Sequence, residues 1–188
     1  MSERPTPSQT IGPFFAIMLP LGSNELVPRD SAGALCLEGQ VFDGAGQPVP
    51  DALIEAWQAN RHGKYHHPAD EQELPLDPAF TGYGRCATDA AGTFRFWTVK
   101  PGRVPAATGE ARQAPHITLT IFARGLLKHL VTRVYFADES TANAADPLLS
   151  SIDDPAIRAT MIAEMPSPNI AHFDVHLQGE NETAFLAV

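Results

Sequence analysis

Short segments in which apolar and polar side chains alternate are the feature that most constrains the fold of this chain. In residues 34–42, Leu35, Leu37 and Val41 fall on one side of the alternation and mostly polar residues on the other. A period of two residues is typical of a β-strand with one buried face. Similar runs cover residues 52–58, 86–96, 114–123, 129–136 and 172–177. We therefore expect a mainly β chain, folded as an antiparallel β-sandwich with long loops.

Proline content and one capping sequence refine this expectation. The 188 residues include 17 prolines, about twice the usual share of roughly 5%, which favours turns over long helices. One short helix is expected after Asp154, a suitable N-cap that precedes Pro155 at the first helical position. Ile157 and Met161 lie four residues apart, and the pattern continues to Met165 before a proline-rich stop.

The first 34 residues differ from the rest of the chain. They contain no alternating run, but they carry apolar side chains such as Ile11 and Phe14 beside a Gly-Pro pair. We predict an N-terminal arm over residues 1–34 that packs on a partner chain, followed by one β-sandwich domain over residues 35–188. No internal repeat or linker interrupts this domain.

Charge and apolar content limit the classes of partner. The formal net charge is −9 at pH 7, which argues against nucleic acids and anionic membranes as main partners. No apolar run approaches the 18 or so residues of a membrane span, and no signal-peptide core is visible near Met1. We expect a cytoplasmic protein in which Cys36 and Cys86 are reduced and buried.

Few residues suggest chemistry by type and spacing alone. The chain has no glycine-rich phosphate loop and no serine nucleophile elbow. His116 and Thr118 lie two apart on an expected strand, so their side chains share a face. Two histidines at this spacing would be a usual metal-binding pair, but threonine is a poor ligand for a transition metal. Residue types alone therefore leave the site of an acidic β-sandwich open.

Longer motifs carry a family resemblance. The stretch from Leu37 to Tyr65, with its Leu-x-Gly-x-Val, Ile-Glu-Ala and Gly-x-Tyr elements, resembles the signature of the intradiol ring-cleavage dioxygenases. The resemblance continues through Thr98-x-Lys100-Pro101-Gly102, Ala114-Pro115-His116-Ile117 and Arg133-x-Tyr135-Phe136. It covers nearly the whole chain and implies a non-haem iron dioxygenase fold.

The resemblance also shows what this chain lacks. Iron-bearing members hold Fe(III) with two tyrosines and two histidines. Tyr65 and His116 match one ligand of each kind, whereas Val104 and Thr118 stand at the other two positions. Gln113 replaces the arginine that stabilises negative charge on the substrate. These degenerate positions imply that this chain binds no iron tightly and has no dioxygenase activity alone.

The resemblance then implies a partner. Two segments, Thr6 to Pro13 and Phe122 to Gly125, are similar to family members in which a non-iron chain pairs with a homologous Fe(III)-bearing chain. Such pairs gather into larger oligomers and cleave protocatechuate with O₂ to 3-carboxy-cis,cis-muconate. The residues expected to border the partner's substrate pocket are Thr10, Gly12, Pro13 and Arg124. Fe(III) would belong to the partner.

Two other interpretations stay open at this point. A self-sufficient dioxygenase acting on catechol or a related diol would need a second tyrosine and a second histidine from elsewhere, and Tyr83 and Tyr135 are the remaining tyrosines. A non-catalytic sandwich of the transthyretin type, serving as a carrier or interaction module, would need no metal at all.

Overall fold

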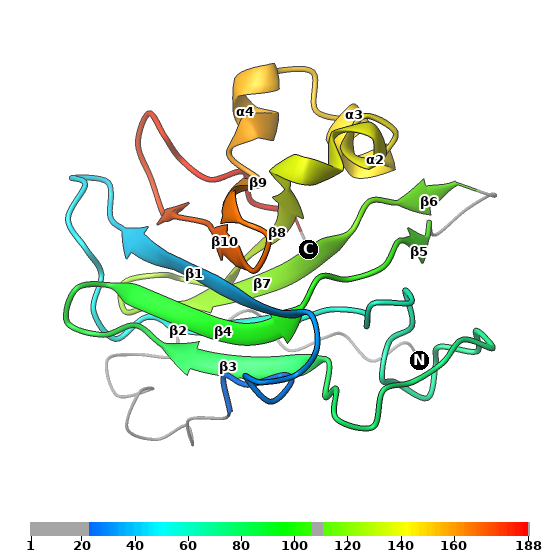
Figure 1. Ribbon diagram of the computed structural model, residues 1–188. Coiled ribbons are helices and arrows are strands. Elements are labelled where there is room, and N and C mark those ends of the chain that lie inside the picture. The colour runs from blue at the N-terminus through cyan, green and yellow to red at the C-terminus, as the bar shows by residue number, and fades with distance from the viewer. Residues whose placement is uncertain (1–22, 107–110, 188) are drawn as a thin grey trace, which may run out of the picture.

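The computed structural model describes residues 23–106 and 111–187. Within these residues the chain is mainly β, as predicted, with short helices between β8 and β9 (Figure 1). The strands are β1 (Ala34–Phe42), β2 (Leu53–Trp57), β3 (Tyr83–Ala87), β4 (Thr93–Val99), β5 (Val104–Pro105), β6 (Arg112–Gln113), β7 (His116–Phe122), β8 (Leu130–Phe136), β9 (Ile162–Ser167), β10 (Ile170–His172) and β11 (Val175–His176). The helices are the 3₁₀ helix η1 (Ala137–Glu139), α2 (Ser140–Ala144), α3 (Pro147–Ser150) and α4 (Pro155–Ala159).

The main sheet is mixed, so the expected purely antiparallel sandwich is wrong. Its strands follow the order β11-β1-β10-β9-β8-β7-β2-β3, and β4 pairs with β1 along Ala34 to Gln40, off this path. β1 pairs in parallel with β10 and β11, and β8 pairs in parallel with β9. A parallel pair needs a crossover connection, and the helices η1 to α4 supply it between β8 and β9. Sequence alternation predicts strands but carries no information about their direction.

The sheet curves until it nearly closes. β3 and β4 lie side by side and contact each other, although they belong to different ends of the strand path (Figure 1). The curved sheet encloses the main hydrophobic core, to which β7 contributes Ile117, Leu119 and Ile121. Val134 and Phe136 of β8 point into the same core. The side chains at alternate positions of β7 and β8 therefore point outward.

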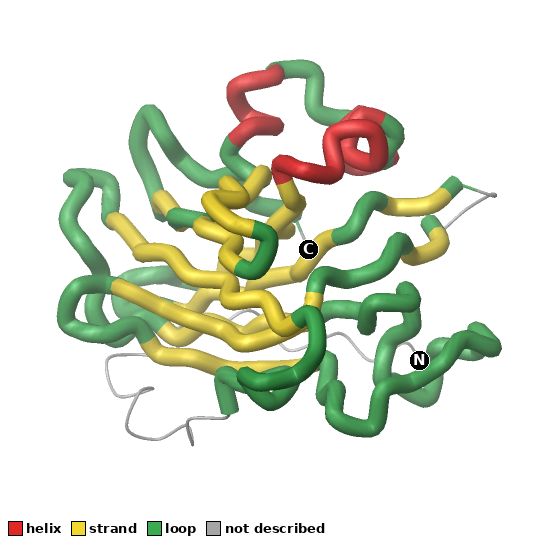
Figure 2. Tube along the Cα trace, viewed as in Figure 1, coloured by secondary structure: helices red, strands yellow, loops and turns green. Residues whose placement is uncertain are grey.

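The helices cover one end of that outer face. Figure 2 shows them gathered together beyond the strands. They form a second, smaller apolar cluster that includes Tyr135 of β8, Leu149 of α3 and Met161. The rest of the outer face carries Trp57, Thr118 and Arg133, which neighbour one another across β2, β7 and β8.

The predicted helix after Asp154 is only partly right. Asp154 caps α4 by accepting a hydrogen bond from the Ala156 N–H (2.8 Å), but the helix ends at Ala159. The residues that follow form β9, whose Ala163 is fully buried in the core. Pairing of β9 with β8 and β10 outweighs the helical spacing of its apolar residues. The chain also has α2 and α3, which the prediction of one short helix missed.

Residues 23–33 pack on this chain's own domain. Leu26 and Val27 are buried, and the Leu26 N–H donates to the Trp97 carbonyl at 2.7 Å. Residues 1–22 lie outside the described part, so the predicted contact of the arm with a partner stays a prediction. Among the described residues no helix is long and apolar enough to cross a membrane. Cys36 and Cys86 are free thiols; the first is buried and the second half-buried.

Candidate functional site

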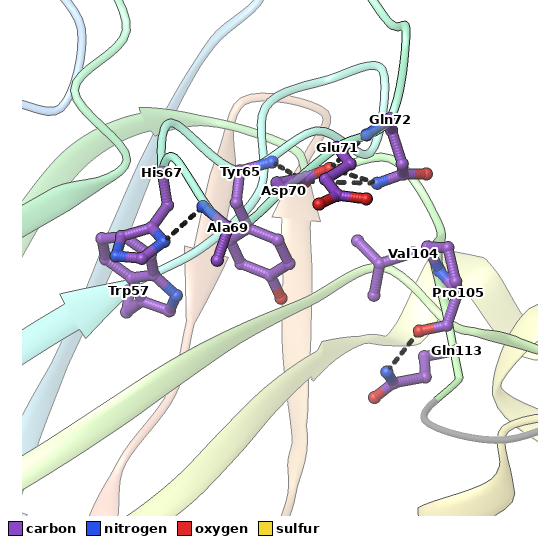
Figure 3. A pocket seen from close by; sticks show the side chains of 10 residues that line it. All are labelled: Trp57, Tyr65, His67, Ala69, Asp70, Glu71, Gln72, Val104, Pro105 and Gln113. Atoms are coloured by element: carbon purple, nitrogen blue, oxygen red, sulfur yellow. Dashed lines mark hydrogen bonds between the residues drawn. The ribbon is translucent and has the colours of Figure 1, made fainter.

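A cleft of about 630 Å³ opens where the loop of residues 60–78 and the β5–β6 hairpin meet the outer face of the sheet. Tyr65, Val104 and Gln113, three of the positions that the family motifs single out, line this one cleft (Figure 3). Its walls combine aromatic, aliphatic and polar side chains. The full lining is Trp57, Tyr65, His67, Ala69, Asp70, Glu71, Gln72, Val104, Pro105 and Gln113.

Tyr65 is held against the sheet by ring stacking. Its ring lies 5.8 Å from that of Trp57, centroid to centroid, with 9° between the planes. Figure 3 shows the Tyr65 ring between Trp57 and Val104. Burial raises the pKa of the Tyr65 hydroxyl, and the nearby positive charge of Arg133 opposes that rise in part. The hydroxyl is therefore neutral at pH 7.

Polar contacts within the loop fix the position of Tyr65. The Asp70 carboxylate accepts the backbone N–H of Tyr65 at 2.7 Å and that of Gln72 at 3.0 Å. Burial alone would raise the pKa of Asp70, but these N–H donors outweigh it and hold the pKa below its usual range. Gly63 is required at the loop entry, because it has φ +83° and a Cβ there would lie 2.2 Å from the Arg103 carbonyl oxygen.

Gln113 closes the opposite wall of the cleft. Its side-chain Nε2 donates to the Pro105 carbonyl (2.8 Å), and its Oε1 accepts a hydrogen bond from Arg133 Nη1 (2.6 Å). Val104, at the start of the same hairpin, is only 3% exposed and offers no ligand atom. The described hairpin residues that line the cleft, Val104, Pro105 and Gln113, therefore supply a wall and one hydrogen-bonded amide, and none of these three carries a charge.

His116 on β7 does not line the cleft; it is buried and neutral. Its Nδ1 is 2.8 Å from the Ala114 carbonyl oxygen, so Nδ1 carries the proton and Nε2 is an acceptor. Burial lowers the pKa of His116 to about 4, with a further contribution from Arg133. Thr118 lies two residues along the same face, directly opposite Arg133.

These residues do not fit the iron of the family. A ferric site needs several anionic or imidazole donors around one point, and the positions expected to supply them hold one neutral phenol, one imidazole, Val104 and Thr118. The guanidinium of Arg133 adds positive charge beside Tyr65 and His116. Across residues 23–106 and 111–187 no cluster of three His, Cys, Asp or Glu side chains could hold a metal instead.

The two remaining tyrosines do not complete the set. The Tyr135 ring lies 5.7 Å from that of His116, but its hydroxyl donates to Asp146 Oδ1 (3.1 Å). Burial, first of all, raises the pKa of Tyr135 far above its usual value, so it stays protonated. Tyr83 is 40% exposed on β3, where its hydroxyl donates to Glu55.

Arg124 lies far from this cleft. It is the second residue after β7, at the end of that strand opposite to His116. Seven residues of strand at roughly 3.3 Å each separate the two ends by about 20 Å. Its Nη1 is 3.2 Å from Asp51 Oδ2, and 57% of the side chain is exposed. Thr10, Gly12 and Pro13 lie outside the described residues, so their expected roles stay predictions.

Reasoning from the sequence singled out neither Trp57 nor Arg133 as site residues. The alternation in β2 places Trp57 on the same outer face as Glu55. This pattern tells which face a side chain is on, but it does not indicate a function. Arg133 occurs in a family motif, two residues from Tyr135. Only the pairing of β8 with β7 places it beside Thr118.

Comparison with known proteins defines the class. The sequence profile of the dioxygenase family matches residues 25–179. The dioxygenase domain of a dioxygenase–carbohydrate-binding protein fusion from Streptomyces sp. SirexAA-E has a similar structure, with a TM-score of 0.62 and 28% identity. The similarity covers 96% of this chain and 100% of that one. This chain belongs to the intradiol ring-cleavage dioxygenase family, as its motifs predicted.

Particular relatives fall into two kinds of chain. The protocatechuate 3,4-dioxygenase alpha chain of Pseudomonas putida is 42% identical over 196 residues, which cover 96% of this chain and 94% of that one. The protocatechuate 3,4-dioxygenase beta chain of Burkholderia cepacia is 36% identical over 79% of this chain and 66% of its own length. This chain is therefore similar to both chains of a heteromeric enzyme, and over nearly its full length to the alpha chain.

Proposed function

We propose that this chain is the iron-free alpha subunit of a protocatechuate 3,4-dioxygenase. Its partner is a homologous beta chain, which carries the Fe(III) site. The observation that carries the proposal is the chemistry of the degenerate site: Val104 and Thr118 stand at two ligand positions, and Arg133 lies opposite Thr118. Similarity to an alpha chain over almost the full length supports the same assignment.

The reaction would take place on the partner. Protocatechuate and O₂ combine, the ring opens between the two hydroxylated carbons, and both oxygen atoms enter the product 3-carboxy-cis,cis-muconate. No residue of this chain's own cleft takes part in bond breaking. Its contribution is to complete the walls of the partner's substrate pocket and to form the protomer from which a larger oligomer is built.

Arg124 is the described residue best suited to that contribution. It lies beyond the end of β7 that is about 20 Å along the strand from His116, so it can serve a substrate only across a subunit boundary. Asp51 holds one edge of its guanidinium, and more than half of the side chain is exposed. The free edge suits the carboxylate of protocatechuate, because guanidinium pairs with carboxylates through two parallel hydrogen bonds.

The N-terminal arm would provide the second contact. Thr10, Gly12 and Pro13 match the family segment that borders the substrate, and they precede residues 23–33, which are anchored to this domain by Leu26 and Val27. An anchored base allows the preceding residues to extend onto a partner. The arm is proposed to order on the beta chain, where its apolar side chains leave water.

Co-expression with the homologous beta chain tests the assignment. We expect a stoichiometric complex with about one Fe(III) per pair of chains, red-brown colour and oxygen uptake with protocatechuate, while this chain purified alone is colourless and inactive. Arg124→Ala in the complex should raise KM for protocatechuate without dissociating the chains. An isolated chain that holds one iron and consumes oxygen would instead support the self-sufficient enzyme, and a colourless complex without uptake would support a carrier.

A further inference from the structure

Asp51 occupies a backbone conformation that is rare for residues with a side chain. Its φ is +58°, and among the described residues it is the only non-glycine residue with a positive φ. It lies in the connection of residues 43–52 between β1 and β2, where Thr88 holds the backbone on both sides of it. The Thr88 hydroxyl donates to the Val49 carbonyl oxygen and accepts the Ala52 N–H, both at 2.8 Å. Asp51 is therefore fixed in the left-handed region, where side chains are strained.

The carboxylate of Asp51 is only partly satisfied. Its Oδ1 is buried, and no donor in the described part of the chain reaches it. A buried acceptor without a partner lowers the stability of the fold, and a negative charge increases that cost. Its Oδ2 has one contact, with Arg124 Nη1 at 3.2 Å. Asp51 thus combines two unfavourable features, and an exposed arginine is its one described side-chain partner.

Strand pairing places Asp51 opposite Arg124. β2 and β7 are antiparallel, and Leu53 lies opposite Phe122 at one end of the pair. Asp51 is two residues before Leu53, and Arg124 is two residues after Phe122, so the same register continues to this pair beyond the strand ends. The ion pair therefore joins the turn before β2 to the turn after β7, and the paired strands hold both turns in place.

Stability alone does not favour an aspartate at this position. The pair is exposed, with 57% of the Arg124 side chain and 35% of the Asp51 side chain accessible to water, so solvent and salt screen its attraction. Glycine would adopt the positive φ without strain, and asparagine would adopt it without burying a charge. A strained residue that adds little to the fold indicates a functional role.

We propose that Asp51 is a positioning residue, which holds Arg124 in the orientation needed to bind the carboxylate of the substrate across the subunit boundary. This inference rests on the proposed function, in which Arg124 borders the partner's substrate pocket. An unrestrained arginine on a turn samples many rotamers, and losing that freedom on binding weakens affinity. Asp51 restricts the side chain before the substrate arrives. Nε and Nη2 make no hydrogen bond within the described residues, so they are available to a carboxylate.

Orientation, and not charge, is the benefit that Asp51 provides. Its carboxylate lowers the net positive charge of the pair, which by itself would weaken the attraction of an anion. If charge controlled binding, removing the carboxylate would therefore tighten it. If orientation controls binding, a neutral acceptor for Arg124 Nη1 should serve nearly as well as the carboxylate, and loss of the acceptor should weaken binding.

Substitutions at Asp51 in the co-expressed complex with the beta chain test the proposal. Asp51→Gly removes the acceptor and should raise KM for protocatechuate by roughly five- to twenty-fold while kcat changes by less than about twofold. Asp51→Asn keeps an acceptor for Nη1 and should stay within about threefold of the parent KM. The urea midpoint of the full chain should not fall in either variant, because glycine removes the strain and asparagine removes the buried charge.

Two controls separate positioning from folding. Asp43→Asn is the matched variant, because Asp43 lies in the same connection and its carboxylate accepts only the N–H groups of Ala45 and Gln47, both at 2.9 Å. Its KM should equal that of the parent. The double variant Asp51→Gly/Arg124→Ala should have the KM of Arg124→Ala alone, because both changes remove the same interaction.

The outcomes that would overturn the proposal differ from those that would refute the proposed function. An unchanged or lowered KM in Asp51→Gly, additive effects in the double variant, or a clear fall in the urea midpoint of Asp51→Gly would exclude a positioning role for Asp51. A parent complex without iron or oxygen uptake would instead refute the proposed function, and the role of Asp51 with it.

Discussion

Thr118 on β7 lies directly opposite Arg133 on β8, on the outer face of the sheet. The family motif predicts a histidine at the position of Thr118, so the guanidinium is adjacent to a position where a metal ligand would be expected. A permanent cation at this place opposes the binding of another cation whether or not ligands are present. The residues present therefore disfavour iron in two ways, by offering few donors at Val104 and Thr118 and by the positive charge of Arg133.

Restoring the ligands alone should not restore iron binding. The double variant Val104→Tyr/Thr118→His supplies four donors, but the guanidinium of Arg133, which lies opposite position 118 in the sheet register, would still oppose the binding of a trivalent cation by Coulomb repulsion. After loading with Fe(III) and dialysis we expect less than about a tenth of an iron per chain. Adding Arg133→Gln to the double variant should raise the iron content to about one ion per chain. A double variant that is fully loaded while it keeps Arg133 would refute the role of its charge.

Protonation of His116 should destabilise the fold in mild acid. Its pKa is about 4 in the folded chain and about 6.5 when unfolded, so between these values the unfolded chain binds a proton that the folded chain does not. The contribution of neutral His116 to the free energy of unfolding is complete above pH 6.5 and is lost as the pH falls toward 4. At pH 5 the loss is roughly 2 kcal/mol.

Urea unfolding at pH 7 and pH 5 measures this contribution. His116→Asn keeps a donor for the Ala114 carbonyl but does not titrate, so its drop in unfolding free energy between the two pH values should be smaller by about 2 kcal/mol. Equal drops in the parent and the variant would show that other groups control the acid sensitivity.

Asp146 should contribute more to the free energy of unfolding than a normal helix cap. It is fully buried and accepts the N–H groups of Ala114, Leu148 and Leu149 as well as the Tyr135 hydroxyl. Asp146→Ala leaves all four donors unpaired and should cost roughly 3–5 kcal/mol of unfolding free energy.

Asp154 provides the comparison for Asp146. It also precedes a proline at a helix start, but it is exposed, and its side chain caps only the Ala156 N–H. Asp154→Ala should cost about 1 kcal/mol in the same urea titration. Similar losses in the two variants would contradict the role of Asp146 in joining the segment between β6 and β7 to β8 and α3.

Gly39 should tolerate no side chain. A Cβ at this position of β1 would lie 1.8 Å from the Phe173 carbonyl oxygen, between β10 and β11. Gly39→Ala must move one backbone segment and should cost more than about 3 kcal/mol or prevent folding. At Gly44 the nearest atoms are Gln178 Cβ and Oε1, both at 3.3 Å, so a shift of a few tenths of an ångström would make room. Gly44→Ala should change the urea midpoint only slightly, and a similar loss in both variants would argue against the close approach at Gly39.

Local patterns in the sequence predicted much of the fold. Alternation identified β1, β2, β7 and β8 within a residue or two, and the Asp-Pro pair at 154–155 correctly marked the start of α4. The end of that helix was wrong, because Ile162 to Met165 satisfy a helical spacing and yet pair as a strand with β8 and β10. Pairing between distant segments decided the outcome there.

The sequence by itself determined which residue types stand at the four motif positions Tyr65, Val104, His116 and Thr118, because each motif is contiguous in the chain. It also determined which side chains share a face of one strand, since the period of two is a local property. Only the tertiary structure decided that Trp57, Thr118 and Arg133 are neighbours. Strand order and register depend on contacts between residues far apart in the chain, and these place the Arg133 guanidinium opposite Thr118, the position where the family motif predicts a second histidine.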